Sequence, residues 1–258
     1  MIARLLVFWG CSVLAQMALA GDQPRELDYA ANLQRNLGMG QIVWLNAGDQ
    51  KFLGLLTEAE KSDNSNAAIV LHDQGEQPDQ QFLIHGLRTV LPQHNWTTLA
   101  VQLPLREIGA GAADYYPLFD EARERIRASV EFLRGKGAKN IAVIGYGMGA
   151  AMAAYSISLD PDALLALAAI SLPLPDSDLP QAQIGQFIPK IALPFLDLYA
   201  EFDLPEVVDT ARQRRMLAKD NPVYRQIRIN GENHAYQHDP GMVIKRVYSW
   251  LALTLSPN

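Results

Sequence analysis

Residues 141–151 read IAVIGYGMGAA, and this stretch decides the fold class. The apolar run 141–144 is typical of a strand covered on both faces, and the small residues after it allow a helix to begin directly against the sheet. The arrangement has the form of a nucleophile elbow, the G-x-S-x-G turn whose central serine stands above the sheet. In this chain the central residue is Gly147, so the turn is present and its usual nucleophile is absent.

Strand-like and helix-like segments alternate on both sides of this turn, which predicts an α/β protein with a mostly parallel sheet. A polar lead-in runs through Asn36, and a hairpin of strands 42–45 and 52–56 opens the sheet. Expected parallel strands are 67–71, 97–101, 141–144, 164–170, 195–199 and 224–229. Expected helices are 81–91, 118–133, 148–159, 207–218 and a last one carrying Val243, Val247, Trp250 and Leu251. We therefore expect about eight strands with helices on both faces, and no large lid, since the longest excursion is 172–193.

An acid and a histidine follow the elbow in the chain order nucleophile, acid, histidine. Asp203 comes after the strand 195–199, and His234 comes after the strand 224–229. A carboxylate beside an imidazole fixes its tautomer and orientation, so the two residues are a candidate catalytic dyad. Glu201 is a competing partner for His234, and a structural hydrogen bond without catalysis is the plainer interpretation.

The loop after the first parallel strand is a candidate oxyanion loop. It reads His72, Asp73, Gln74 and Gly75, and it lies where backbone N–H groups would face a reacting carbonyl. The N–H of Met148, directly after the elbow, would be the second donor. Plainer roles are open for this loop too, because a histidine at a strand end is more often structural than catalytic.

Several stretches together resemble the α/β-hydrolase superfamily. They are 71–75 with 78–79, 87–88, 96–99 with 103–104, the elbow 145–150, and His234. More closely, the chain resembles an uncharacterised family of secreted bacterial proteins distantly related to that superfamily, over nearly the whole chain after residue 20. The resemblance implies a hydrolase fold and a site built from Gly147, Asp203 and His234.

A glycine at the elbow cannot attack a substrate, so the sequence favours a noncatalytic binding or interaction protein over a conventional serine hydrolase. The alternative is a hydrolase of ester-type substrates in which Asp203 and His234 activate a water. A more distant alternative is dinucleotide binding, because Gly145, Gly147 and Ala150 match G-x-G-x-x-A, although no acid ends the next strand. If the rest of the site is intact, replacing Gly147 with serine should create esterase activity or probe labelling.

The first twenty residues have the character of a secretory signal. Arg4 precedes a short apolar run, and Ala18 and Ala20 supply the small residues before a cleavage site. We expect cleavage after Ala20, a single domain over residues 21–258, a periplasmic location and no membrane span. Cleavage would also remove Cys11, the one cysteine of the chain, so no disulfide or thiol chemistry is expected.

Composition argues against several partners. The net charge is −6 and no Lys/Arg cluster occurs, which removes the electrostatic basis of nucleic-acid binding. His234 and His238 are four residues apart, but Asp239 and Pro240 follow directly and indicate a loop, so no metal or other cofactor is predicted. Apolar residues in 103–117 and 172–193 should frame a pocket for a small, partly apolar ligand, and a protein partner is the alternative. The side chains concerned are Leu105, Ile108, Tyr115, Tyr116, Leu174, Ile184 and Phe187.

Overall fold

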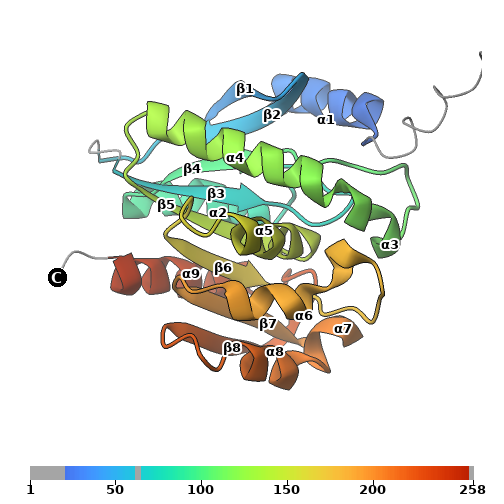
Figure 1. Cartoon of the computed structure of the whole chain (residues 1–258). Helices are drawn as coiled ribbons and strands as arrows, with labels where there is room; N and C mark the ends of the chain where they lie inside the picture. Colours follow the sequence, from blue (N-terminus) through green and yellow to red (C-terminus); the bar gives the residue numbers. More distant parts are fainter. Residues whose placement is uncertain (1–20, 62–64, 256–258) are drawn as a thin grey trace, which may run out of the picture.

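The computed structural model describes residues 21–61 and 65–255, so the expected signal segment and Cys11 lie outside the described residues. The described chain forms an eight-stranded sheet with the order β1-β2-β4-β3-β5-β6-β7-β8 (Figure 1). Its strands are β1 (Gln41–Ala47), β2 (Gln50–Thr57), β3 (Asn66–Leu71), β4 (Thr97–Val101), β5 (Asn140–Tyr146), β6 (Ala166–Ile170), β7 (Phe195–Phe202) and β8 (Tyr224–Asn233).

The strand directions match the prediction. β1 and β2 form the antiparallel hairpin, and β2 is also antiparallel to β4. All neighbours from β4 through β8 are parallel, which confirms the expected two antiparallel and six parallel strands. The hairpin closes through Gly48 and Asp49, and Gly48 takes the positive φ of 58° that such tight turns require.

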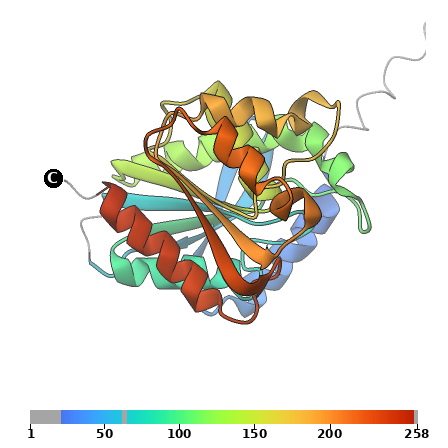
Figure 2. The same ribbon diagram turned by 90° about the horizontal axis from the view of Figure 1, so that it is seen from below.

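Helices cover both faces of the sheet, as expected (Figure 2). One layer contains α4 (Phe119–Gly135), α5 (Met148–Leu159) and the short α6 (Ile184–Phe187), and the other contains α1 (Gln23–Asn36), α2 (Leu83–Val90) and α9 (Pro240–Leu255). Side chains of each parallel strand alternate between the layers. In β3, Ile69 belongs to the core under α4 and α5, whereas Val70 belongs to the core under α2 and α9.

Helix α1 corrects the sequence interpretation, which placed no element before residue 42. The Asp22 side chain caps the helix by accepting a hydrogen bond from the Arg25 N–H. Glu26 is buried and bonds Arg125 of α4, with Nη1 and Oε2 2.8 Å apart. A buried ion pair therefore anchors α1 together with Ala30 and Leu33, and a charged residue on the buried face weakens the hydrophobic periodicity that would predict the helix.

The helix predicted over 207–218 is divided into α7 (Pro205–Val208) and α8 (Ala211–Leu217). The Glu206 carbonyl accepts from the Leu174 N–H and the Thr210 hydroxyl, so it is not available to continue α7. The excursion 172–193 contains α6, whose Ile184 and Phe187 are buried in the core. It lies on the helical layer and does not form a lid.

The candidate residues lie where parallel strands end. Asp73 follows β3, Gly147 follows β5, Asp203 follows β7 and His234 follows β8. Because the carboxyl ends of parallel strands share one edge of a sheet, the topology brings these four positions together. Over residues 21–61 and 65–255, no helix combines the length and hydropathy needed to cross a bilayer.

Candidate active site

The elbow between β5 and α5 is built by close packing around three glycines. Gly147 has φ 55° and ψ −119°, a conformation that L-residues adopt only with strain. A Cβ on Gly145 would lie 2.6 Å from Ala150 Cα, and one on Gly149 would lie 2.4 Å from the His72 carbonyl oxygen. The glycines at 145 and 149 therefore allow strand, helix and the β3 loop to approach, whatever residue occupies position 147.

The Asp73 carboxylate fills the space above Gly147. A Cβ on Gly147 would lie 2.2 Å from Asp73 Oδ1. Asp73 Oδ1 accepts hydrogen bonds from the backbone N–H groups of Met148, at 2.6 Å, and Gln74, at 2.7 Å. The two donors expected of an oxyanion hole thus bind a carboxylate of the protein itself. Met148 was singled out from the sequence, whereas Gln74 takes the donor position expected of Gly75.

His234 lies between two carboxylates. Its Nδ1 is 2.7 Å from Asp203 Oδ1, and its Nε2 is 2.9 Å from Asp73 Oδ2. Glu201 does not compete for His234, because its carboxylate accepts from the Gly231 N–H and faces Arg228. The structure therefore brings together the two residues of the predicted dyad, and adds Asp73 on the side where a serine hydroxyl would stand.

The electrostatics of this triplet favour a protonated imidazole. Burial alone would lower the pKa of His234, but the hydrogen bonds and charges of Asp203 and Asp73 raise it to about 9. Burial would raise the pKa of Asp203, but hydrogen bonds from His234, Ser171 and the Ala200 N–H lower it overall. At neutral pH the site holds an imidazolium between two carboxylates. In this state His234 can donate a proton but cannot accept one.

His72 orients the loop that carries Asp73. It is buried, and burial lowers its pKa to about 4, so the ring is neutral. Its Nε2 accepts from the Leu103 N–H at 2.9 Å, which places the proton on Nδ1, where it is donated to the Asp73 carbonyl 2.7 Å away. The Gly75 carbonyl on the same loop accepts from Arg25. His72 and Gly75 therefore position the loop that carries Asp73.

Three hydroxyls hold Asp203 and His234 in place, and one of them is that of Tyr236, which donates to Asp203 Oδ2 at 3.3 Å. Ser171, which follows β6 with a φ of 53°, donates to Asp203 Oδ2 at 2.5 Å. Tyr146 donates to the His234 carbonyl at 2.7 Å. Because the Ser171 hydroxyl is bound to the acid and not to the imidazole, it lacks the adjacent base that activates a serine nucleophile.

The geometry does not suit the other sites weighed from the sequence. The N-terminus of α5, where a pyrophosphate would lie, is occupied by the Asp73 carboxylate, and Ser171 replaces the acid expected after the next strand. His234 and His238 lie in a turn, where Tyr236 has a φ of 47°. Within the described residues, no group of three or more His, Cys, Asp or Glu has the arrangement of a metal site.

A cavity of about 50 Å³ opens above Asp73 and His234. Of the seven side chains expected to frame it, only Tyr116 lines it: five are not among its lining residues because they are buried elsewhere, and Ile108 is exposed to solvent. The cavity is also lined by Leu204, Glu206 and Val207 from the segment after β7, three residues that the sequence pattern did not indicate. The volume is sufficient for a few water-sized groups.

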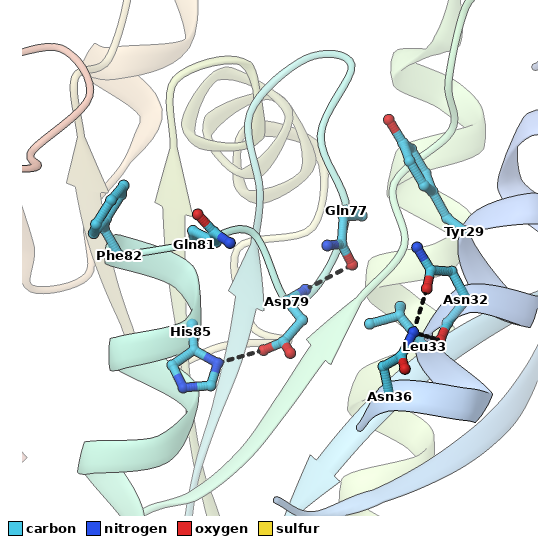
Figure 3. Close-up of a pocket in the computed structure, with 9 residues that line it drawn as sticks. All are labelled: Tyr29, Asn32, Leu33, Asn36, Gln77, Asp79, Gln81, Phe82 and His85. Atoms are coloured by element: carbon cyan, nitrogen blue, oxygen red, sulfur yellow. Dashed lines mark hydrogen bonds and ion pairs between the residues drawn. The ribbon is translucent and has the colours of Figure 1, made fainter. Parts of the chain in front are cut away.

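A larger groove of about 530 Å³ lies between α1 and α2 (Figure 3). Its polar side chains largely bond one another. His85 Nδ1 is 2.8 Å from Asp79 Oδ1, and Asn36 donates to Asn32 at 2.6 Å. None of its lining residues belongs to the triplet, so the candidate chemistry lies in the smaller cavity.

The sheet order, the elbow after β5, and the acid and histidine after β7 and β8 define an α/β-hydrolase fold. Within it, the chain belongs to the family described as a protein of unknown function, DUF3530, whose profile matches residues 17–114 and 118–252. No curated protein matches the sequence.

Solved structures with the same fold include esterases and a lactone hydrolase. Est1E from Butyrivibrio proteoclasticus with bound ferulic acid is 14% identical with a TM-score of 0.69, covering 83% of this chain and 100% of that one. Dienelactone hydrolase from Anabaena variabilis is 16% identical with a TM-score of 0.68, covering 83% and 97%. The Pyrococcus furiosus esterase Pf2001 is 17% identical with a TM-score of 0.69, covering 84% and 91%. At these identities the likeness shows the fold alone.

Proposed function

We propose that this protein is a hydrolase whose nucleophile is the Asp73 carboxylate, supplied by the β3 loop in place of an elbow side chain. The observation that carries the proposal is the position of Asp73, whose Oδ1 lies 2.2 Å from where a Cβ on Gly147 would be. Carboxylates of Asp and Glu are established nucleophiles in covalent catalysis. A carboxylate from the loop after the neighbouring strand β3 would thus take the place of the missing hydroxyl.

The two oxygens of Asp73 have different partners and would have different tasks. Oδ1 accepts from the N–H groups of Met148 and Gln74, which fixes the plane of the carboxylate. Oδ2 faces the His234 Nε2, and both Asp73 and His234 line the cavity. Oδ2 is therefore the atom that would attack.

These different partners of Oδ1 and Oδ2 indicate a substrate whose leaving group is bound to a saturated carbon. Attack on a carboxylic ester would create an oxyanion that needs N–H donors, and those of Met148 and Gln74 are already bound to Asp73. Displacement at a tetrahedral carbon creates no such oxyanion. We therefore assign the first step to an alkyl substrate, such as an alkyl halide.

The reaction then balances in two steps. Asp73 Oδ2 bonds to the carbon while the leaving group departs with the bonding electrons, which produces an alkyl ester on Asp73. This ester no longer carries the charge that helps to keep His234 protonated, so the imidazolium can release its Nε2 proton to solvent. Neutral His234, oriented by Asp203, then takes a proton from a water that attacks Asp73 Cγ.

The second step uses the N–H groups already in place. The oxyanion of the tetrahedral intermediate forms on Oδ1, beside the Met148 and Gln74 donors. The Cγ–Oδ2 bond breaks, and the alcohol leaves with Oδ2 and a proton from His234. The carboxylic acid that remains on Asp73 then transfers its proton to His234, which restores both the carboxylate and the imidazolium. The alcohol oxygen comes from Asp73, and the water oxygen remains in the carboxylate.

Isotope transfer tests this mechanism. In a single turnover of a short alkyl bromide in ¹⁸O-water, we expect an alcohol without ¹⁸O and an Asp73-containing peptide that gains it. The His234→Ala variant should accumulate the alkyl ester, visible by intact mass, because it lacks the base for the second step. An ¹⁸O-labelled alcohol would favour direct attack by a water that His234 and Asp203 activate, and no adduct in either protein across alkyl substrates would refute Asp73 as the nucleophile.

A noncatalytic binding protein is the second candidate function, and two observations favour it. The cavity above the triplet is small, and His234 is held protonated between Asp203 and Asp73. In that case Asp73 is an internal ligand that closes the site of a former hydrolase. A flat substrate panel together with a copurifying ligand would support this function.

We also propose that the protein acts in the periplasm. The support is the signal-like segment 1–20 and the confinement of cysteine to that segment. N-terminal sequencing of the protein purified from its native host should begin at Gly21. An intact Met1 or a lipid on Cys11 would contradict this proposal.

A further inference from the structure

The cavity above Asp73 has an acidic lining without a fixed cation. Asp73 and Glu206 contribute carboxylates to it, and His234 contributes the one group that can be positive. No Lys or Arg is among the residues of the described chain that line it. The nearby Arg25 guanidinium is bound to the carbonyls of Gly75 and Arg106.

Two of the side chains that line the cavity, Tyr116 and Glu206, form no hydrogen bond or ion pair with other residues of the described chain. Tyr116 is 3% exposed, and within the described part of the chain its hydroxyl forms no hydrogen bond. The Glu206 carboxylate likewise forms no ion pair or hydrogen bond with other described residues. The Tyr116 side chain is almost fully buried, but its oxygen is not an enclosed atom, so it can form a hydrogen bond with a molecule in the cavity.

The two groups line the same small cavity. Burial, and next the charge of Glu206, raise the pKa of Tyr116 to about 12. The phenol therefore stays neutral and can accept a hydrogen bond on its oxygen, while the carboxylate accepts two or more. Together they offer acceptors and negative charge, a combination that suits a donor-rich cation.

The balance of charges around the cavity also favours a cationic ligand. Asp73, Asp203 and Glu206 carry three negative charges, against one on protonated His234. An anionic ligand would meet net repulsion, whereas a cation would be attracted. The cavity of about 50 Å³ limits what enters to a narrow head group, such as a primary ammonium.

We propose that Tyr116 and Glu206 form a subsite for the ammonium end of a short alkylammonium ligand. The ammonium would donate to the Glu206 carboxylate and the Tyr116 oxygen, while the alkyl chain extends toward Asp73 Oδ2. That this ligand is the substrate rests on the proposed function, whereas its binding does not.

Binding of propylammonium chloride tests the subsite without any turnover. In NMR titrations that follow the His234 and Tyr116 ring signals, we expect saturable binding to the protein of residues 21–258, with a dissociation constant in the millimolar range. Propanol and acetate should bind far more weakly. Glu206→Gln should weaken propylammonium binding by about tenfold or more, because a charge-assisted hydrogen bond is lost.

A matched control separates the subsite from general charge effects. Asp209 is exposed, lies three residues beyond Glu206 and is not among the residues lining the cavity. Asp209→Asn should leave binding within about twofold of the parent, and Tyr116→Phe should weaken it several-fold. Unchanged thermal melting would show that each variant is folded.

Equal binding of propylammonium and propanol, or equal affinity of the parent and Glu206→Gln, would overturn the subsite. Failure here is distinguishable from failure of the proposed function. Isotope transfer through Asp73 without ammonium binding would leave the hydrolase and reject the ligand class. Ammonium binding without any adduct on Asp73 would leave the subsite and reject the nucleophile.

Discussion

The double variant Asp73→Gly/Gly147→Ser is expected to react with a fluorophosphonate probe, whereas the wild-type protein and Gly147→Ser alone are not. Sequence reasoning expects the single substitution to complete a serine site. The structure shows why it should not, since even the Cβ of a residue at 147 would lie 2.2 Å from Asp73 Oδ1. The single variant must displace Asp73, whereas the double variant removes the clash.

The remaining parts of the site would then serve the new serine. Removing Asp73 frees the N–H groups of Met148 and Gln74 for the probe oxygen, and oxyanion donors contribute on the order of 10² to 10³ in rate. His234 keeps Asp203 as its orienting partner and loses one of the two carboxylates that hold it protonated. The positive φ at position 147 should cost about 1–3 kcal/mol of stability in any variant with a side chain there.

The matched control is Asp73→Gly/Gly147→Ala, which has the same space and the same backbone strain but no hydroxyl. It should fold to the same stability as the serine variant and remain unlabelled in the probe assay. Labelling of Gly147→Ser at the rate of the double variant would show that Asp73 does not block the elbow. A folded double variant without labelling would show that His234 and Asp203 are not placed as a working base, and would favour the noncatalytic function.

The meeting of Asp203 and His234 could be predicted from the sequence, because the topology of the sheet determines it. Asp203 and His234 each follow a parallel strand, and the carboxyl ends of such strands meet at one edge of the sheet. Their chain order after the elbow therefore predicted that they would meet, and the 2.7 Å contact shows that they do. Their catalytic role stays a prediction, because geometry alone does not measure turnover.

The role of Asp73 could not be predicted, because it depends on where one side chain points. Sequence placed Asp73 correctly on the β3 loop but assigned that loop to backbone donors. The informative signal was present at Gly147, since an elbow without a side chain leaves space beside β3, the neighbour of β5 in the sheet. An acid directly after that neighbouring strand can fill the space.

Helix α1 escaped prediction for a different reason. Pattern analysis detects helices by their apolar stripe, and the buried face of α1 contains Glu26 beside Ala30 and Leu33. Burial of Glu26 depends on its ion pair with Arg125, which lies 99 residues away in the chain. Long-range pairs of this kind have no periodic signature.

The Asp73→Asn variant is expected to have a lower His234 pKa than the wild type. Its free energy of unfolding should also decrease less as the pH rises into the alkaline range. In the wild-type protein this pKa is raised from 6.5 to about 9, with Asp73 and Asp203 as the cause that outweighs burial. Because the folded value lies above the unfolded one, the protonated imidazole stabilises the fold fully below about pH 6.5. That stabilisation is lost as the pH rises through about 9.

The effect should be large enough to measure. A shift from 6.5 to about 9 corresponds to about 3 kcal/mol at most, and the partial exposure of His234 reduces this value. Asp203 acts at the other end of the scale, since its lowered pKa stabilises the fold above about pH 3.8 and this contribution is lost as the pH falls. The triplet therefore favours the folded state most between about pH 4 and 6.5.

NMR titration of the His234 ring, with thermal melting from pH 6 to 10, measures both quantities in the wild type and in Asp73→Asn. The control Glu206→Gln removes a charge from the same cavity without touching the Asp73 contact to His234, so it should lower the pKa less. An unchanged His234 titration in Asp73→Asn would contradict the contact between Nε2 and Oδ2. An alkyl ester on Asp73 removes the same negative charge as the Asp73→Asn substitution does. A lowered His234 pKa in this variant would therefore show that ester formation can convert His234 from an acid into a base at neutral pH. His234 would then act as a base only after the first step has occurred.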